Sequence, residues 1–333
     1  KSSLYGRMGI RNNKKGPQLM NIIIVGGKGF IGSHVANKLS LKHNITIIDG
    51  WSKSYPGFSM IHRGAKGLQP ISELERQHRL IAHSYRQKLI SGIKCVNKWT
   101  FNNFMDANLE SLRPDLIINC GGLCEAILSQ YLEEFTHDST VIGLQNIKRV
   151  FECPIIQMSS SMVYGTWEGK ITEDHSLNPV DWYGECKRKA EMLLDTTKDV
   201  ILRPMHVYGL GDGSFPITMN IERQSKANRP INIEEADCLY IKDFVVLIEK
   251  IVDNLVSGIY NVSSGYNRDK NVVKKFAKKL MQIDVETKSK LGPTGKQRGQ
   301  LDNTKIKEIF NWKLNYLTYE ESVMDYIGEH ENL

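Results

Sequence analysis

The sequence VGGKGFIG occupies residues 25–32, directly after the apolar run Asn21–Val25. Its glycines stand at positions 26, 29 and 32, and the apolar residues that follow in Ile31–Leu41 have helical spacing. A tight strand-to-helix turn, a close approach of the backbone to a pyrophosphate and close helix–strand packing all exclude a Cβ atom, and a helix N-terminus favours an anion. The stretch therefore predicts a dinucleotide-binding turn, with Gly26, Gly29, Phe30, Ile31 and Gly32 as cofactor-binding residues.

An acidic residue closes the next apolar run. Asp49 follows Ile45–Ile48 and lies 17 residues after Gly32, close to the spacing of roughly 20 expected for a carboxylate that binds the adenosine ribose. A carboxylate also repels a 2′-phosphate, so Asp49 favours NAD over NADP. The competing interpretation is an ordinary turn residue before Gly50.

The remaining apolar runs indicate the fold class. Runs at 93–96, 116–119, 155–158 and 200–202 alternate with helical patterns near 101–110, 131–152 and 181–197. This alternation predicts an α/β fold with a doubly wound parallel sheet of the Rossmann type. The rhythm breaks near residue 205, which indicates a smaller C-terminal lobe. Between residues 50 and 92 lies an insertion that includes a polar, helical piece at 71–89.

Composition excludes several classes of protein. The 333 residues carry 44 Lys and Arg against 37 Asp and Glu, a formal charge of +7. Five bases and no acid fall in residues 1–19, so the rest carries 39 − 37 = +2, too little to indicate nucleic-acid binding. No apolar run approaches the roughly 20 residues of a membrane span. The six cysteines have neither CxxC spacing nor a histidine cluster, so we expect no metal site and a cytoplasmic protein.

Two further motifs predict a catalytic centre. Tyr183 and Lys187 are four residues apart at the start of a predicted helix, so both side chains face one side. A neighbouring ammonium lowers the pKa of a phenol and makes it a better base. Three serines at 159–161 follow the strand at 155–158, and one hydroxyl there can polarise a reacting oxygen.

Five motifs in this order resemble the extended short-chain dehydrogenase/reductases that act on nucleotide sugars. They are GGKGFIGSHV (26–35), MSSSMVYG (158–165), NPVDWYGECKRKAE (178–191), LRPMHVYG (202–209) and GIYNVSSG (258–265). The resemblance spans about residues 20–330. Residues 1–19 are rich in Gly, Asn and Lys and lack an apolar period, so we interpret them as an N-terminal extension outside the fold. The resemblance implies an NAD-binding Rossmann domain at 20–205 and a lobe at 206–333 that mainly binds the nucleoside-diphosphate sugar, with some segments returning to the first domain. A homodimer is usual in this family.

The resemblance also implies roles for individual residues. Tyr183 becomes the catalytic base, Lys187 its partner that also holds the nicotinamide ribose, and Ser160 the catalytic hydroxyl that touches substrate. Cys120, Gly121 and Gly122 fall where the family has small residues that line the cofactor, and Arg298 where an arginine often meets the substrate diphosphate. Five positions depart from the pattern. His206 replaces a substrate-binding Asn, Thr140 an Asn, Asn97 an adenine-contacting Asp, Ala236 an Arg and Cys186 a Ser.

Several reactions remain open at this point. Dehydratases of the family resemble Thr-Asp-Glu where this chain has Ser160-Ser161-Met162, so dehydration is disfavoured. We expect an NAD-dependent nucleotide-sugar epimerase that oxidises the sugar transiently, at C4, and reduces it on the opposite face. Alternatives are a nucleotide-sugar reductase, a dehydratase or an enzyme like the UDP-sulfoquinovose synthases. A non-catalytic NAD-bound scaffold or RNA-binding protein of the same fold is the alternative of another class.

Overall fold

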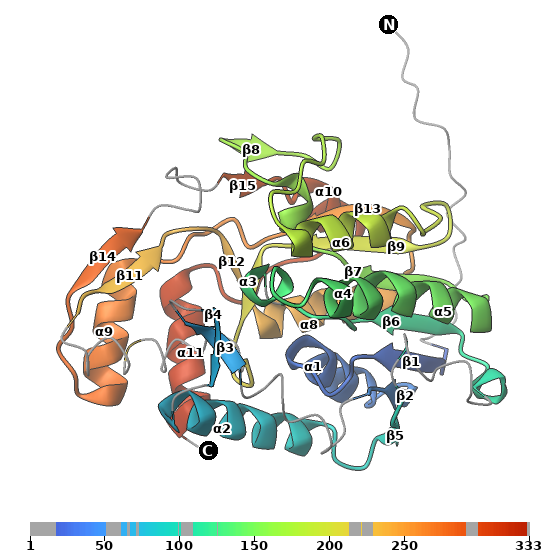
Figure 1. Ribbon diagram of the computed structural model, residues 1–333, viewed down its shortest axis with the longest axis horizontal. Helices are drawn as coiled ribbons and strands as arrows, with labels where there is room; N and C mark the ends of the chain where they lie inside the picture. Colours follow the sequence, from blue (N-terminus) through green and yellow to red (C-terminus); the bar gives the residue numbers. More distant parts are fainter. Residues whose placement is uncertain are drawn as a thin grey trace, which may run out of the picture.

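The computed structural model describes residues 18–50, 61–64, 67–70, 73–98, 100, 109–124, 126–212, 221, 229–290 and 299–331. A seven-stranded parallel sheet with the order β13-β9-β7-β6-β1-β2-β5 forms its centre, as Figure 1 shows. Reading outward from β1, the order reverses between β1 and β6, as in doubly wound folds. The expected Rossmann-type sheet is therefore confirmed.

The strands of the central sheet are β1 Asn21–Val25, β2 Asn44–Ile48, β5 Lys94–Val96, β6 Leu116–Asn119, β7 Ile155–Met158, β9 Val200–Pro204 and β13 Gly258–Val262. Four pairs of short strands are β3 Ile61–Gly64 with β4 Gly67–Pro70, β8 Lys170–Ile171 with β15 Gln300–Leu301, β10 His206–Tyr208 with β12 Cys238–Tyr240, and β11 Ile231–Glu234 with β14 Thr287–Lys290.

The α-helices are α1 Phe30–Leu39, α2 Glu73–Leu89, α3 Ala126–Ser129, α4 Glu133–His137, α5 Gly143–Val150, α6 Trp182–Glu191, α8 Ile241–Asp253, α9 Lys270–Met281, α10 Thr304–Ile309 and α11 Tyr319–Glu331. Three short helical turns are η2 Glu110–Leu112, η3 Asp138–Ile142 and η4 Ser161–Tyr164. η3 is a π-helical turn that links α4 to α5.

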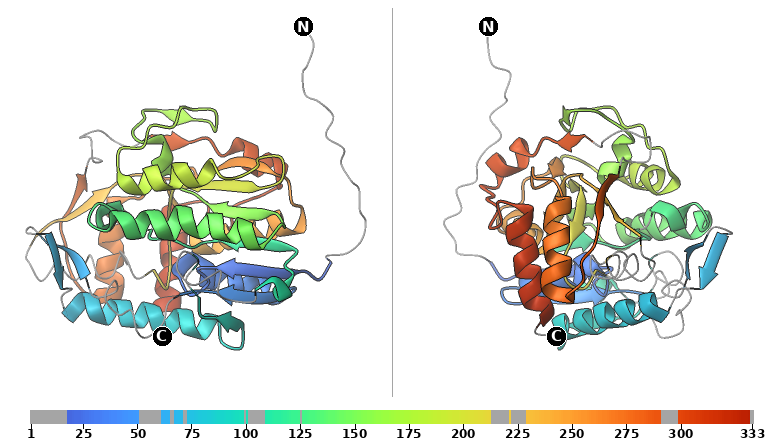
Figure 2. Two further views of the ribbon diagram at one scale, coloured as in Figure 1. Left: turned by 45° about the vertical axis from the view of Figure 1, so that its right-hand side comes forward. Right: turned by 90° about the vertical axis from the view of Figure 1, so that its left-hand side faces the viewer.

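Alternation along the strands explains the layers. Ile22 and Ile24 of β1 join one buried cluster with residues of α1 and α8, whereas Ile23 and Val25 join another with residues of α5 and α6. Because successive side chains of a strand point to opposite faces, β1 buries both of its faces. Helices accordingly cover the sheet on both sides (Figure 2).

The chain beyond residue 205 contributes to both parts of the molecule. β13 adds the last strand to the central sheet, and α8 packs against α1. In contrast, β11, β14 and α9 lie together away from β1 and β2 (Figure 1). The division into two domains at residue 205 stays a prediction, as does the separate role of residues 1–19.

The insertion between β2 and β5 contains the predicted helix. The expected helical piece at 71–89 is α2, Glu73–Leu89, which packs against α1 (Figure 2). β3 and β4 form an antiparallel hairpin before it. The helix expected near 101–110 falls mostly outside the described residues.

Candidate active site

The glycine-rich turn lies between the end of β1 and the start of α1. A Cβ atom on Gly32 would lie 2.3 Å from the carbonyl oxygen of Gly26, and one on Gly26 would lie 2.8 Å from the backbone of Cys120. Gly26 also has φ +72°, which L side chains rarely adopt. The turn therefore presents bare backbone at the N-terminus of α1, a shape that fits a dinucleotide pyrophosphate.

Asp49 lies beside this turn at the carboxyl end of β2. Its Oδ2 accepts a hydrogen bond of 2.9 Å from the backbone N–H of Lys28. The Lys28 ammonium donates a hydrogen bond of 2.5 Å to Oδ1 of Asn97, just beyond β5. Asp49 and Asn97 are thus brought to one end of the turn, where the sequence places the adenosine half of the cofactor.

The loop after β6 forms the other wall. Cys120, Gly121 and Gly122 follow the strand, and the Cys120 N–H donates to the Val25 carbonyl at 2.9 Å. The hydroxyl oxygen of Thr140, on the π-turn η3, would lie 2.8 Å from a Cβ on Gly122. Thr140 is 2% exposed, and its hydroxyl has no hydrogen-bond partner among the described residues. A buried hydroxyl without a partner is costly, so this wall also fits a polar ligand.

The predicted catalytic hydroxyls meet at the carboxyl end of β7. Tyr183 is the second residue of α6, whose N-cap Asp181 accepts a hydrogen bond from the Gly184 N–H at 2.7 Å. Ser160 lies next to the Tyr183 phenol, and Oγ of Ser160 accepts a hydrogen bond of 3.2 Å from the Met162 N–H. Burial raises the pKa of Tyr183 far above its ordinary value, whereas the neighbouring Ser160 hydroxyl acts to lower it. Burial therefore outweighs the lowering of this pKa that the sequence led us to expect.

Lys187 lies one helical turn further along α6. Its ammonium donates to the Met158 carbonyl at 2.8 Å and lies 5.7 Å from the centroid of the Tyr183 ring. Burial lowers the pKa of Lys187. The structure thus brings Tyr183, Lys187 and Ser160 together at one point.

The neighbouring serine has a different environment. The Ser159 hydroxyl donates to the carboxylate of Glu191, which also accepts hydrogen bonds of 3.0 and 2.7 Å from the guanidinium of Arg203. Arg203 in turn donates to the Tyr164 hydroxyl at 2.8 Å. Because Ser159 is bound within this buried network, Ser160 is the hydroxyl available beside Tyr183.

The expected substrate-binding residues are less defined. His206 begins β10, two residues beyond the end of β9, and its side chain is exposed. β9 is the sheet neighbour of β7, so His206 lies on the same edge of the sheet as Ser160. Arg298 lies outside the described residues.

Sequence reasoning missed one residue of the site. Cys124, two residues after Gly122, lies within electrostatic range of both Tyr183 and Lys187. The spacing of Cys124 from the other cysteines did not indicate a place in the active site. It became visible only when the loop after β6 was seen to fold toward the N-terminus of α6.

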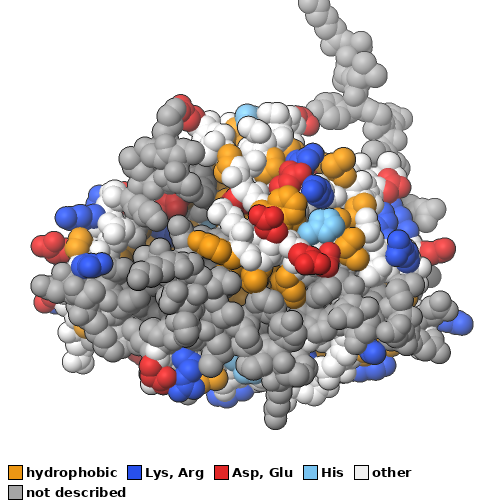
Figure 3. Space-filling model, viewed as in Figure 1, with side chains coloured by type: hydrophobic (Ala, Val, Ile, Leu, Met, Phe, Trp, Pro, Cys, Tyr) orange, Lys and Arg blue, Asp and Glu red, His pale blue; other side chains and the backbone are white. Residues whose placement is uncertain are grey.

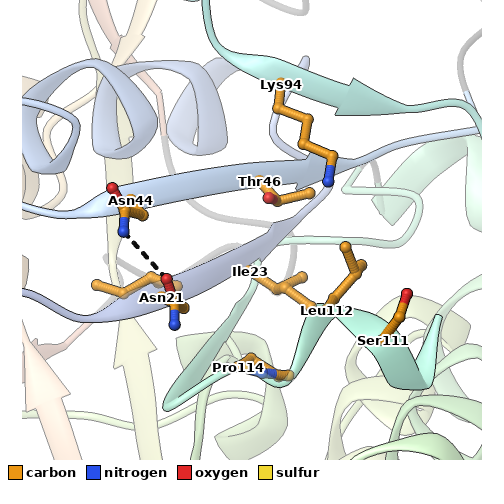
Figure 4. A pocket seen from close by; sticks show the side chains of 9 residues that line it. Asn21, Ile23, Asn44, Thr46, Lys94, Ser111, Leu112 and Pro114 are labelled. Carbon is orange, nitrogen blue, oxygen red and sulfur yellow. Dashed lines mark hydrogen bonds between the residues drawn. The ribbon is translucent and has the colours of Figure 1, made fainter.

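A separate hollow lies at the opposite edge of the sheet. It has a volume of about 190 Å³ and is lined by residues at the amino ends of β1, β2 and β5, among them Asn21, Asn44 and Lys94 (Figure 4). The strands are parallel, so the predicted cofactor and catalytic residues lie at their carboxyl ends. This hollow is not part of the candidate active site.

The fold and these residues define a dinucleotide-dependent enzyme of the Rossmann type. Residues 22–263 match the sequence profile of the NAD dependent epimerase/dehydratase family, and the chain belongs to this family. The match confirms three expectations: the family that the motifs resemble, an enzyme of the epimerase/dehydratase type, and NAD as its cofactor.

Individual proteins agree with this assignment. The chain is 28% identical over 248 residues to an uncharacterized UDP-glucose epimerase of Bacillus subtilis, covering 68% of this chain and 70% of that protein. It is 23% identical over 349 residues to UDP-arabinose 4-epimerase 1 of Arabidopsis thaliana, with coverages of 92% and 78%. The crystal structure of the Bordetella bronchiseptica enzyme WbmG in complex with NAD and UDP superposes with a TM-score of 0.72 at 18% identity, covering 95% of each chain. Epimerases of UDP-sugars thus recur among the relatives.

The remaining expectations concern a membrane span, the location in the cell and the surface charge. None of the helices in the described part of the chain combines the length and the apolar character that a membrane span requires. A location in the cytoplasm stays a prediction. On the face shown in Figure 3, acidic and basic side chains of the described residues are interspersed.

Proposed function

We propose that the protein interconverts UDP-sugars that differ in configuration at C4. The observation that carries this proposal is the convergence of Tyr183, Ser160 and Lys187 beside the loops that fit NAD. The names of the relatives, a UDP-glucose epimerase and a UDP-arabinose 4-epimerase, support the substrate class.

The side chains divide the work as follows. Tyr183, as phenolate, accepts the proton of the C4 hydroxyl, while Ser160 donates a hydrogen bond to the same oxygen. Lys187 stabilises the phenolate by its charge and holds the nicotinamide ribose. NAD supplies the hydride acceptor and then the hydride donor. The resulting 4-keto sugar turns in the site and is reduced on its opposite face, so the proton returns from Tyr183 to the oxygen.

Two predicted contacts complete the substrate site. We assign His206 and Arg298 to the UDP-sugar, His206 because of its place beyond β9 and Arg298 because of the resemblance to the family. These assignments account for binding only, since neither residue needs to exchange a proton in the reaction. Replacing either one is expected to raise KM more than it lowers kcat.

Epimerisation is favoured over dehydration by one local feature. The positions after Ser160 are Ser161 and Met162, and neither can act as a carboxylic acid or base on C5 and C6. A dehydratase needs such groups to remove water, whereas an epimerase needs only the tyrosine and its hydroxyl partner. Reduction of a keto sugar uses the same side chains and remains the second candidate.

One experiment separates the candidate reactions. The protein is incubated with UDP-glucose, UDP-arabinose and UDP-N-acetylglucosamine, with and without added NADH, and the products are identified by mass spectrometry and NMR. An isomer of unchanged mass, formed without net consumption of NADH, is the expected result. Loss of water, consumption of NADH or no product with any sugar would contradict the proposal and favour, respectively, a dehydratase, a reductase or a scaffold.

A homodimer is part of the same proposal. Met192 at the end of α6 is 72% exposed, and Tyr131, just before α4, is 43% exposed. α4 packs against α6, so both apolar side chains lie on one helical layer, where a second copy could cover them. Light scattering coupled to size exclusion is expected to give twice the mass of the 37.9 kDa chain.

A further inference from the structure

A cationic side chain of the insertion reaches the glycine-rich turn. Arg86 lies near the end of α2, and its Nε donates to the carbonyl oxygen of Lys28 at 3.2 Å. Its Nη1 donates to the carbonyl oxygen of Gly211 at 2.6 Å. The half-buried guanidinium thus connects the turn after β1 to the segment after β10.

The charges around Arg86 place it along the cofactor site. Asp212, Cys124 and Asp49 all lie within electrostatic range of the guanidinium. Asp49 marks the end of the site assigned to the adenosine ribose, whereas Cys124 lies near Tyr183 and Lys187. Arg86 therefore lies between the two ends of the site, and the pyrophosphate is the part of NAD that lies between its two nucleosides.

The backbone of the glycine-rich turn carries no full positive charge to balance the two negative charges of a pyrophosphate. The glycine-rich turn offers backbone N–H groups and the N-terminus of α1, which together amount to a partial charge. The Lys28 ammonium is directed away, to Asn97. A guanidinium has five N–H donors, and among the described residues only two of those of Arg86 are used, both by carbonyl oxygens. The carboxylates of Asp212 and Asp49 partly balance this cation, and a guanidinium hydrogen-bonded only to carbonyl oxygens keeps N–H donors with which it can bind phosphate oxygens.

Packing of α2 fixes the position of Arg86. The preceding residue, Tyr85, lies against the ring of His34 on α1, with centroids 5.7 Å apart. A Cβ on Gly211 would lie 3.0 Å from Cδ1 of Tyr85 and 3.3 Å from Cγ of Arg86. The segment at Gly211 is thus pressed against α2, and the guanidinium has little freedom to leave the turn.

We propose that Arg86 binds the pyrophosphate of NAD, so that the insertion helix α2 completes the cofactor site. The proposal rests on NAD binding at the glycine-rich turn and extends the function proposed above by a residue outside its motifs. It gives the insertion between β2 and β5 a role in holding the cofactor. Bidentate contact of an arginine with phosphate oxygens is the chemistry it would supply.

The test compares ligands with and without the pyrophosphate. Dissociation constants of NAD and ADP-ribose are measured by calorimetry, and that of adenosine by displacement of fluorescent NADH, for the unmodified protein, Arg86→Gln and Arg86→Lys. Arg86→Gln is expected to weaken NAD and ADP-ribose by about 10- to 100-fold and to leave adenosine within about 2-fold. Arg86→Lys keeps the positive charge but not the bidentate geometry of the guanidinium, so it is expected to weaken NAD and ADP-ribose binding less than Arg86→Gln does.

Arg76→Gln is the matched control. Arg76 lies on the same helix, its side chain is 42% exposed, and it pairs with Glu73 at 2.7 Å. Its replacement is therefore expected to change none of the three dissociation constants. Equal weakening of adenosine and ADP-ribose by Arg86→Gln would show that Arg86 merely holds the two carbonyl groups, and unchanged ADP-ribose affinity would also overturn the proposal. Where Arg86→Gln fails to fold, the same comparison of adenosine with ADP-ribose in Arg86→Lys decides. Because these are binding measurements, a protein without epimerase activity can still confirm the role of Arg86.

Discussion

The Lys187 ammonium lies 5.7 Å from the centroid of the Tyr183 ring and is hydrogen-bonded to the last residue of β7. The tyrosine lies next to Ser160, which follows the same strand by two residues. Both predicted catalytic side chains of α6 thus lie at the carboxyl end of one strand. The geometry of the pair therefore depends on how β7 ends, and not on α6 alone.

Removing only the titratable oxygen of the pair tests its chemical role. Tyr183→Phe is expected to lower the rate of epimerisation by about 100- to 10,000-fold, the usual contribution of a general acid–base group. NAD affinity should change by less than about 2-fold, since the ring and its packing remain. Turnover of UDP-glucose and calorimetric titration with NAD measure the two effects. Tyr131→Phe, at an exposed position, is the control, and normal turnover in Tyr183→Phe would reject the assignment.

The pH profile tests whether Lys187 acts by its charge. Tyr183 must be deprotonated to accept a proton, so kcat/KM is expected to rise with pH through the pKa of Tyr183 in the complex with NAD. Loss of the neighbouring cation in Lys187→Met removes a stabilising charge from the phenolate, so the rise should move to higher pH by roughly one to three units. If Lys187→Met lowers the maximal kcat/KM but does not shift its pH dependence, Lys187 only positions the cofactor.

Much of this site could be predicted because each part of it lies within a short stretch of sequence. The glycine spacing places the turn, and the four-residue spacing of Tyr183 and Lys187 places both on one face of a helix. The resemblance to the family selects Ser160 among the three serines, and the structure shows a physical difference between them, because Ser159 is bound to Glu191. Local periodicity likewise predicts the strands of the sheet up to β9.

The features that the sequence did not predict depend on contacts between residues far apart in the chain. Arg86 hydrogen-bonds two backbone carbonyl oxygens, 58 and 125 residues away, and a bond to a carbonyl leaves no pattern in the sequence of either partner. β13 joins the sheet beside β9, 54 residues after the end of that strand, so the break in rhythm after residue 205 hides a strand of the central sheet. Such features follow from tertiary packing, which propensity and spacing do not report.

The preference for NAD over NADP is expected to depend on the carboxylate of Asp49. Asp49→Asn keeps the hydrogen bond from the Lys28 N–H but removes the charge that repels a 2′-phosphate. We expect NAD to bind about 10-fold more weakly and NADP to bind more tightly, so that the ratio of the two dissociation constants narrows. Titration with both cofactors measures it, with Asp115→Asn as a control at an exposed site. An unchanged ratio would mean that Asp49 is only a turn residue.

The buried ion pair that binds Ser159 is expected to be structural. Arg203 and Glu191 have side chains that are 3% and 5% exposed and are joined at 2.7 Å. Removing one partner leaves a buried charge without compensation, so Arg203→Met should lower the free energy of unfolding by about 3 to 5 kcal/mol. Urea denaturation measures the loss. The double variant Arg203→Met, Glu191→Leu should recover part of it, and a loss under about 1 kcal/mol in the single variant would contradict this view of the pair.

Acid is expected to destabilise the fold through His34. This histidine lies on α1 between Phe30 and Tyr85, and its Nε2 is hydrogen-bonded to the Leu210 carbonyl at 2.8 Å. Since that carbonyl can only accept, Nε2 carries the proton of the neutral ring. Burial lowers the pKa of His34 from 6.5 to about 4. Between these values the unfolded chain binds a proton that the folded chain does not, so stability falls as the pH drops below 6.5 and this loss is complete near pH 4.

The size of the effect follows from the two pKa values. Between pH 7 and pH 5 the free energy of unfolding should decrease by about 2 kcal/mol through His34 alone. His34→Gln keeps an N–H donor toward Leu210 but cannot be protonated, so its loss over the same interval should be smaller by that amount. Urea denaturation of both proteins at the two pH values measures the difference. Identical losses would show that other groups, such as the buried His43, cause the acid sensitivity.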